Sequence, residues 1–401
     1  MKDYINPIIP IVLLALTLVL LLSITIAPID VDEATNTSLV DILRKKIKVR
    51  LVVETENYTY VEDEDVITYH ALASILSTLL NNDSLGSTWQ DSAGNYRSIA
   101  CLDPDPSFAI IVSDYTGVED DNVYDGPLLG NYVDIIPDTV DVVYNGTHYR
   151  VTLAVYSISV SFETRSVGFV TRHYGQVFDS RAFQLLVMYD ILDTSIPPNT
   201  SMNVTYTITI EASLPFTRNF YNLMIIYWFG GQDIVDITGS LPAELVVYDS
   251  NGNPLPNGYE IHTCTYTEFV IDGTSRDYCV NYVEKQFILL DNYGYINISP
   301  VDAYNVGDNM GSDYQLASIV SSTVQRVDVS LVEWRGSGTA YPPPIGSHTL
   351  YGYGLFLEAC TYDVTYYVMM GYVEFSNPIN VDSGIDSINV DTIVRLGASG
   401  G

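Results

Sequence analysis

The feature that most constrains this chain is a strict alternation of apolar and polar side chains near its middle. Between Asn203 and Glu211, apolar residues alternate with Asn and Thr, which is the period of a strand with one buried and one solvated face. The stretch from Phe183 to Ile191 alternates too, and every second residue from Phe183 to Ile191 falls on the same, apolar side. A loop rich in Pro, Asn, Thr and Ser separates the two stretches. We therefore expect them to pair as antiparallel neighbours that close a sheet.

Other segments fit the same mainly β pattern. The Asn145-Gly146 dipeptide predicts a hairpin turn between strands over residues 133–144 and 149–162. The Ala and Leu spacing of residues 66–80 predicts a helix, and we expect the acidic run 62–65 to stabilise the positive end of its dipole. Residues 220–229 are expected to form a second helix.

Similar pieces recur in the same order along the chain, which favours a tandem duplication. The turn sequence at 249–253 echoes that at 91–95 at a distance of 158 residues, and residues 363–366 echo 203–206 at a distance of 160. At 401 residues the chain is also too long for one ordinary domain. We predict two tandem β-sandwich modules, each with one short helix, behind an N-terminal transmembrane helix.

The predicted organisation has five parts. They are residues 1–30 (a transmembrane anchor or an uncleaved signal), 31–47 (a stalk), 48–213 (β-sandwich module 1), 214–376 (β-sandwich module 2) and 377–401 (a C-terminal strand and tail). The last strand is expected either to complete module 2 or to add to the edge of a neighbouring subunit.

The anchor is predicted from the uncharged apolar stretch between Ile8 and Ala27, whose twenty residues are just long enough to span a hydrocarbon core. A cleaved signal peptide is the competing interpretation, but its apolar region should be shorter. Long domains translocate largely regardless of charge, so we place residues 30–401 outside the membrane. The basic run at 44–50 is then expected to lie against anionic headgroups.

Modification sites follow from this location. Asn-X-Ser/Thr sequons, the acceptors for N-glycosylation, occur at Asn36, Asn57, Asn82, Asn145, Asn199, Asn203 and Asn297. The four cysteines allow three pairings. Cys264 and Cys279 flank an expected hairpin at Asp272-Gly273 and are the favoured disulfide, which leaves Cys101 and Cys360 as the second pair. Four buried thiols are the alternative.

Charge and motifs bound the chemistry. A net charge of −32 repels phosphate backbones, which argues against a nucleic-acid partner. In an acidic habitat the carboxylates would be neutral, leaving a polar, uncharged surface. The five histidines show no helical metal spacing, and neither a Gly-X-Ser-X-Gly motif nor a phosphate-binding glycine loop is present.

An acidic loop between residues 114 and 125 is the candidate metal site. Calcium takes six to eight oxygen ligands, and a solvated acidic loop is the alternative. The candidate ligands for Ca²⁺ are Asp114, Glu119, Asp120, Asp121 and Asp125. We expect no other cofactor.

The order of helix, Asp-Ser-X-Gly-Asn turn, Ser-Asp-Tyr segment, Val/Ser-rich strand and closing Val-Thr-Tyr strand resembles a β-sandwich module of archaeal virus and phage structural proteins and archaeal cell-surface proteins. The matching pieces are 91–95, 160–165 and 183–210 in the first copy, and 249–253, 312–316 and 364–366 in the second. An acidic insertion follows Ser113-Asp114-Tyr115 in the first copy, and the second lacks the Pro-rich loop. The resemblance covers most of residues 61–375 and implies an exposed surface component without a catalytic residue.

We therefore expect a non-enzymatic, membrane-anchored structural protein of an archaeal virion or cell surface, such as a spike, filament or surface layer. It would assemble with itself or with other surface proteins. An adhesin that recognises glycans or a host surface is the alternative, and a secreted hydrolase is less favoured because no nucleophile, dyad or metal motif is evident.

Overall fold

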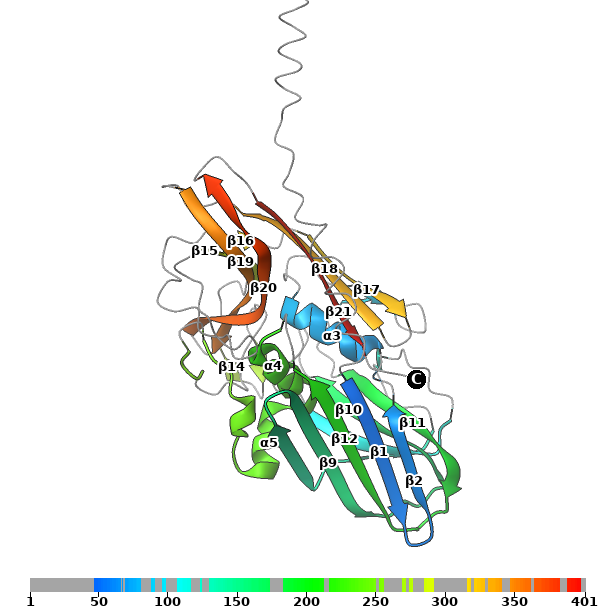
Figure 1. Cartoon of the computed structure of the whole chain (residues 1–401). Helices are drawn as coiled ribbons and strands as arrows, with labels where there is room; N and C mark the ends of the chain where they lie inside the picture. The colour runs from blue at the N-terminus through cyan, green and yellow to red at the C-terminus, as the bar shows by residue number, and fades with distance from the viewer. Residues whose placement is uncertain are drawn as a thin grey trace, which may run out of the picture.

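The structure is a computed structural model in which two sheet systems lie at the two ends of an elongated molecule, with helices between them (Figure 1). The residues it describes are 47–65, 67, 69–80, 88–90, 96–98, 107–116, 123–124, 130–173, 183–212, 216–249, 252–255, 269–271, 274–276, 285–291, 316–318, 321–328, 331–340, 347–361, 364–382 and 388–397. Every strand pairing among them is antiparallel, which confirms the mainly β fold.

The first sheet is built around β12, the strand with the strict alternation. Its order is β2-β1-β12-β9-β8. The bounds are β1 Ile47–Thr55, β2 Thr59–Asp65, β8 Thr139–Tyr144, β9 His148–Ile158 and β12 Met202–Glu211. Buried and half-buried residues alternate along all of β12, so Val204, Tyr206 and Ile208 enter the core while the threonines between them face outward.

The second sheet contributes to the same core and has the order β6-β11-β10-β5-β7. The bounds are β5 Ser107–Ser113, β6 Val123–Tyr124, β7 Tyr132–Ile135, β10 Thr164–His173 and β11 Phe183–Ile196. Its centre is buried on both faces. Phe108 and Phe169 join the main core, whereas Ile111 and Leu186 belong to a smaller cluster on the other face. We call the two sheets the N-terminal sheet pair.

β11 and β12 do not pair with each other, so the expected hairpin is wrong. β11 lies between β10 and β6 in the second sheet, whereas β12 lies between β1 and β9 in the first. The loop 197–201 therefore crosses from one sheet to the other. A two-residue period identifies a strand with a buried face, but it does not identify the strand's neighbour.

Other local expectations have mixed outcomes. The Asn145-Gly146 turn is confirmed, since it joins the paired strands β8 and β9, and Gly146 has a φ of +96°. The single strand expected over 133–144 is divided into β7 and β8, which lie in different sheets. The acidic residues 62–65 end strand β2 and do not cap a helix.

The C-terminal sheets have the orders β16-β15-β19-β20 and β17-β18-β21. The bounds are β15 Lys285–Asp291, β16 Leu316–Ser318, β17 Ser321–Asp328, β18 Leu331–Ala340, β19 Ser347–Thr361, β20 Val364–Asp382 and β21 Ile388–Gly397. The last strand, β21, pairs with β18 of its own chain over its whole length. It therefore completes a sheet in this half of the molecule.

Two short strand pairs flank two of the expected turns, whose own residues lie outside the described part of the chain. β3 (Thr88–Gln90) pairs with β4 (Tyr96–Ser98) around residues 91–95. β13 (Phe269–Ile271) pairs with β14 (Thr274–Arg276) around Asp272-Gly273.

Two helices lie between the sheet systems, and both predicted helical segments are confirmed. α3 (Tyr69–Leu80) contacts β17, β18 and β21 as well as β11. α4 (Arg218–Phe229) contacts β20 and also β5. Each helix therefore touches both sheet systems, and one continuous apolar core runs from Val49 in β1 through Trp228 in α4 to Trp334 in β18. The short helices α5 (Gly231–Thr238) and η2 (Ala243–Leu245) follow α4.

Hydrogen bonds of α4 fasten the junction between the sheet systems. Tyr149 of β9 donates its hydroxyl to Asn222 Oδ1 at 2.6 Å and accepts from Arg218 Nε at 3.2 Å. On the other side, Thr217 Oγ1 donates to the carbonyl of Met369 in β20 at 2.6 Å. These buried polar groups are thus partnered across the junction, which fixes α4 between the N-terminal sheet pair and β20.

The segments that echo each other in sequence have different strand neighbours. β20 begins with the echo of β12, yet it pairs with β19, the strand just before it, from Thr361↔Val364 to Ser347↔Asp382. β12 has no such pairing with the preceding strand β11. The tandem arrangement of equivalent modules is therefore not confirmed and, like the boundary at residue 213, stays a prediction.

Candidate functional site

The strongest candidate site among the described residues joins β2, an edge strand of the first N-terminal sheet, to β11 of the second. Tyr60 on β2 donates its hydroxyl to Asp190 Oδ1 on β11 at 3.1 Å. The two strands lie side by side in Figure 1. The second carboxylate oxygen of Asp190 is buried and has no hydrogen-bond partner within the described part of the chain. We call Tyr60 and Asp190 the carboxylate latch.

A β-bulge places Asp190 in this position. β10 pairs Phe169 with Met188 and Val170 with Leu186, so Val187 is an extra residue in β11. Such a residue shifts the inward positions of the strand by one. Asp190 therefore turns toward the core side, and Ile191, which the alternation places on the apolar side, is 46% exposed.

Burial controls the protonation of the latch. It raises the pKa of Asp190 to about 6, because the charged carboxylate loses solvation. The hydrogen bond from Tyr60 opposes this rise, while the negative charges of Glu62 and Asp193 add to it. Burial, and then the charge of Asp190, likewise raises the pKa of the Tyr60 hydroxyl, which stays protonated and able to donate. The site can therefore take up a proton in mildly acidic solution.

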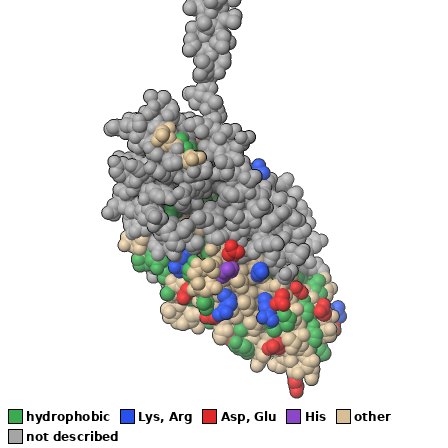
Figure 2. Space-filling model, viewed as in Figure 1, with side chains coloured by type: hydrophobic (Ala, Val, Ile, Leu, Met, Phe, Trp, Pro, Cys, Tyr) green, Lys and Arg blue, Asp and Glu red, His purple; other side chains and the backbone are tan. Residues whose placement is uncertain are grey.

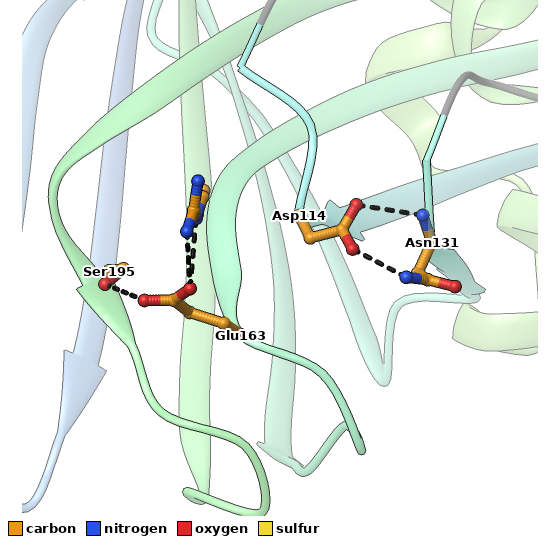
Figure 3. Close-up of polar contacts among 5 residues, drawn as sticks. Asp114, Asn131, Glu163 and Ser195 are labelled. Carbon is orange, nitrogen blue, oxygen red and sulfur yellow. Dashed lines mark hydrogen bonds and ion pairs between the residues drawn. The ribbon is translucent and has the colours of Figure 1, made fainter.

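A second polar cluster fixes the loops at the same end of the sheet pair as the loop 197–201. Glu163 accepts from Ser195 Oγ at 2.5 Å and from Arg165 Nη2 at 2.7 Å (Figure 3). The bond from Ser195, followed by that from Arg165, lowers the pKa of Glu163, so this carboxylate stays charged. The cluster ties the β9–β10 connection to β11.

Asp114, at the start of the acidic loop predicted to bind calcium, is hydrogen-bonded to Asn131, which follows the loop. Its carboxylate accepts from the backbone N–H of Asn131 at 2.9 Å and from Asn131 Nδ2 at 2.6 Å (Figure 3). Tyr189 and Ser166 both donate hydroxyl hydrogen bonds to the carbonyl of Tyr115, each at 2.6 Å, which secures the loop start to the second sheet. The other candidate ligands, Glu119, Asp120, Asp121 and Asp125, lie outside the described residues.

The calcium site therefore stays a prediction. The described residues contain no group of three or more His, Cys, Asp or Glu side chains placed to hold a metal ion.

The sequons fall in different places. Asn57, Asn145 and Asn199 are exposed and Asn203 is half-buried, while Asn36, Asn82 and Asn297 lie outside the described residues.

One of the four cysteines lies within the described residues. Cys360 pairs through its backbone with Thr365 in the β19–β20 hairpin. Cys101, Cys264 and Cys279, together with the stretch 8–27, lie outside the described residues. Within the part that is described, no helix is both long and apolar enough to cross a membrane.

The outward face of the first sheet is a mixed polar surface. Arg50 pairs with Asp63 at 2.8 Å, and Arg150 lies 4.0 Å from Asp141, with the half-buried Thr207 on β12 between these pairs. Figure 2 shows the basic and acidic side chains interspersed with neutral ones over the described surface. The described residues of this face therefore form no patch of a single charge sign.

Searches for known relatives produced no match to this chain among protein-family models, curated proteins or solved structures.

Sequence reasoning missed the carboxylate latch for a physical reason. Asp190 falls within an alternating strand, and its inward direction depends on the bulge at Val187. The bulge in turn depends on the pairing with β10, which the sequence of β11 alone does not specify. The weak local signal is Asp190 itself, a charged residue inside an apolar strand.

Proposed function

We propose that this chain is a membrane-anchored extracellular structural protein of an archaeal virion or cell-surface assembly, and that it acts by assembling with itself or with other surface proteins. The stretch 8–27 is the anchor, and the rest of the chain lies outside. The N-terminal sheet pair is a β-sandwich, and the C-terminal sheets are a second module whose strand order differs.

The observation that supports this proposal is the continuous core between the two sheet systems. Phe229 of α4 lies 6.0 Å from Phe108 and 5.1 Å from Phe169 between ring centroids, and the same helix is joined to β20 through Thr217. A large shared apolar interface resists relative domain motion. A stiff β body of this kind suits a rigid building block of a surface assembly.

The test uses the full chain in its native membranes. Envelopes or particles are purified from the source, and antibody-labelled electron microscopy locates the chain. We expect it in regular arrays, filaments or spikes, and we expect deletion of residues 8–27 to release it into the soluble fraction. A chain that is monomeric in mild detergent and scarce in purified envelopes contradicts the proposal.

An adhesin is the second candidate, and an exposed aromatic side chain favours it. Tyr156 is 53% exposed and Ile136 is 66% exposed. The backbone N–H of Tyr156 donates to Asp138 Oδ2 at 2.7 Å, and Ile136 lies two residues before Asp138 in the chain. An exposed aromatic face can pack against a sugar ring. A glycan array probed with the wild type, Tyr156→Ala and the control Thr207→Ala tests this candidate. An adhesin requires that the wild type and Thr207→Ala bind a glycan and that Tyr156→Ala does not.

A further inference from the structure

Segments far apart in the sequence meet at one end of the N-terminal sheet pair, and each carries a sequon. Asn57 lies in the turn between β1 and β2, and Asn199 lies in the loop between β11 and β12. The pairings Thr55↔Met202 and Glu54↔Asn203 bring the turn and the loop to the same end. In Figure 1 this end lies farthest from β17, β18 and β21. We call it the distal end.

The loop that carries Asn199 has a defined shape. The backbone N–H of Asn199 donates to the carbonyl of Val160 at 2.7 Å, and Thr200 N donates to Pro197 O at 3.3 Å. Asn199 has a φ of +60°, a left-handed conformation that Asn tolerates better than most residues. Its side chain is exposed on this fixed loop.

Asn57 is presented in a similar way. Thr55 closes the turn, because its backbone N–H donates to the carbonyl of Tyr58 at 2.7 Å and its Oγ1 accepts from Asn57 N at 3.4 Å. Both Asn57 and Thr59, the hydroxyl residue of its sequon, are exposed. The turn leaves room around this side chain.

Asn203 differs although it has the same sequon and lies at the same end. Its side chain is half-buried in β12, and its Oδ1 accepts from the backbone N–H of Ser157 at 2.9 Å. Ser157 has a φ of +58°, a left-handed backbone conformation that non-glycine residues rarely adopt. The hydrogen bond from Ser157 holds the side-chain amide of Asn203 in place, so its Nδ2 cannot turn freely outward to carry a bulky sugar.

We propose that the distal end is a two-glycan surface, with oligosaccharides on Asn57 and Asn199, and that Asn203 stays unmodified. In the modification the amide Nδ2 attacks the anomeric carbon of an oligosaccharide carried on a polyprenyl phosphate. The C–N bond forms, the bond from that carbon to the phosphate oxygen breaks, and the amide proton leaves with the lipid phosphate. No oxidant or reductant is involved.

This inference rests on the proposed location outside the membrane and adds an orientation to it. A glycan-covered end is hydrated and sterically blocked, so it faces solvent. Contacts with neighbouring subunits then use the sheet faces or the C-terminal sheets. Asn145 lies at the opposite end, beside Tyr149 and α4, and is not part of this surface.

The experiment maps sugars on the full-length protein from its native source. Chymotryptic peptides are analysed by mass spectrometry, and electron-transfer fragmentation assigns each sugar to one asparagine. We expect sugar on Asn57 and Asn199 and none on Asn203. Protease accessibility of intact cells or particles is measured in parallel. A protein outside the membrane with bare Asn57 and Asn199, or with sugar on Asn203, overturns this inference alone, whereas a protein inside overturns the proposed function as well.

Variants sharpen the assignment without changing the asparagines. Ser201→Ala removes the sequon of Asn199 and keeps Asn in the left-handed position, so we expect the mass to fall by one glycan. Thr59→Val should remove the other glycan. The matched control is Thr205→Val, which removes the sequon of Asn203 on the same end and should cause no loss of sugar. A glycan loss in this control contradicts the proposal.

Discussion

The N-terminal sheet pair and the C-terminal sheets connect similar strands in different ways. Between β11 and β12 the chain crosses from one sheet to the other through five residues that include Pro197 and Pro198, whereas β19 and β20 are joined by two residues and pair directly. Proline cannot donate to a strand ladder, and it fixes φ. The two connections therefore differ in length and in proline content, although the strands that follow them echo each other in sequence.

The strands of the N-terminal sheet pair and of the C-terminal sheets lie in separate sheets, whereas the helices α3 and α4 contact both halves of the molecule. α3 follows β2 in the N-terminal sheet pair but packs on β17 and β18. α4 precedes the C-terminal sheets, yet its Phe229 packs on Phe108 and Phe169. Because each helix buries side chains in both halves, we expect the halves to unfold together.

The largest expected effect comes from the core of the C-terminal sheets. Trp334 is fully buried in the shared core, so Trp334→Ala should lower the free energy of unfolding by roughly 3–5 kcal/mol. Hydrogen exchange measured by mass spectrometry should show the same loss of protection in β9 and β12 as in β19. The control is Thr207→Ala on the outward face. Loss of protection confined to the C-terminal sheets would mean that the halves are independent.

The junction itself is tested by Tyr149→Phe. The substitution leaves Asn222 Oδ1 without its donor in a buried place, which should cost about 1–3 kcal/mol of unfolding free energy in a urea titration. Tyr156→Phe is the matched control, because Tyr156 is exposed and should tolerate the loss of its hydroxyl. Equal effects of the two substitutions would show that the junction hydrogen bonds do not hold α4 in place.

The carboxylate latch should make the N-terminal sheet pair more stable in mild acid. The pKa of Asp190 is raised in the folded state to about 6, so folding favours the protonated form. This stabilisation is fully present below the unfolded-state pKa and is lost as the pH rises through 6. Burial also raises the pKa of Asp233, which adds to the stabilisation in mild acid. Unfolding free energy should therefore increase from pH 7 to pH 5.

The variant Asp190→Asn measures how much of this pH dependence of the unfolding free energy comes from the carboxylate latch. Between pH 7 and pH 5, the increase in unfolding free energy should be about 1 kcal/mol smaller for the variant than for the wild type. The difference is no larger because Asp190 is partly solvated. Glu54→Gln, an exposed carboxylate on the first sheet, is the control for the general relief of negative charge. Identical pH profiles for the wild type and Asp190→Asn would rule out the latch as a proton-linked group.

The smallest expected effect concerns the outward face of the first sheet. Arg50 and Asp63 are more than half exposed, so Arg50→Gln should change the unfolding free energy by less than about 0.5 kcal/mol. The melting temperature should stay nearly constant and respond little to added salt. If this variant nevertheless fails to enter purified envelopes, the outward face is a subunit contact and not a stability element.

The sequence by itself determined the local elements of this protein. The period of residues 203–211, the Asn145-Gly146 turn and the two apolar helices depend on neighbouring residues only, and the structure confirms each of them. Tertiary structure decided which strands are neighbours, which way Asp190 points and where α3 and α4 pack. Those features depend on which strands come together, both near in the chain, as in the β10–β11 pairing that contains the bulge, and far apart, as in the contact of Tyr60 with Asp190. The alternation within one strand does not specify such partners.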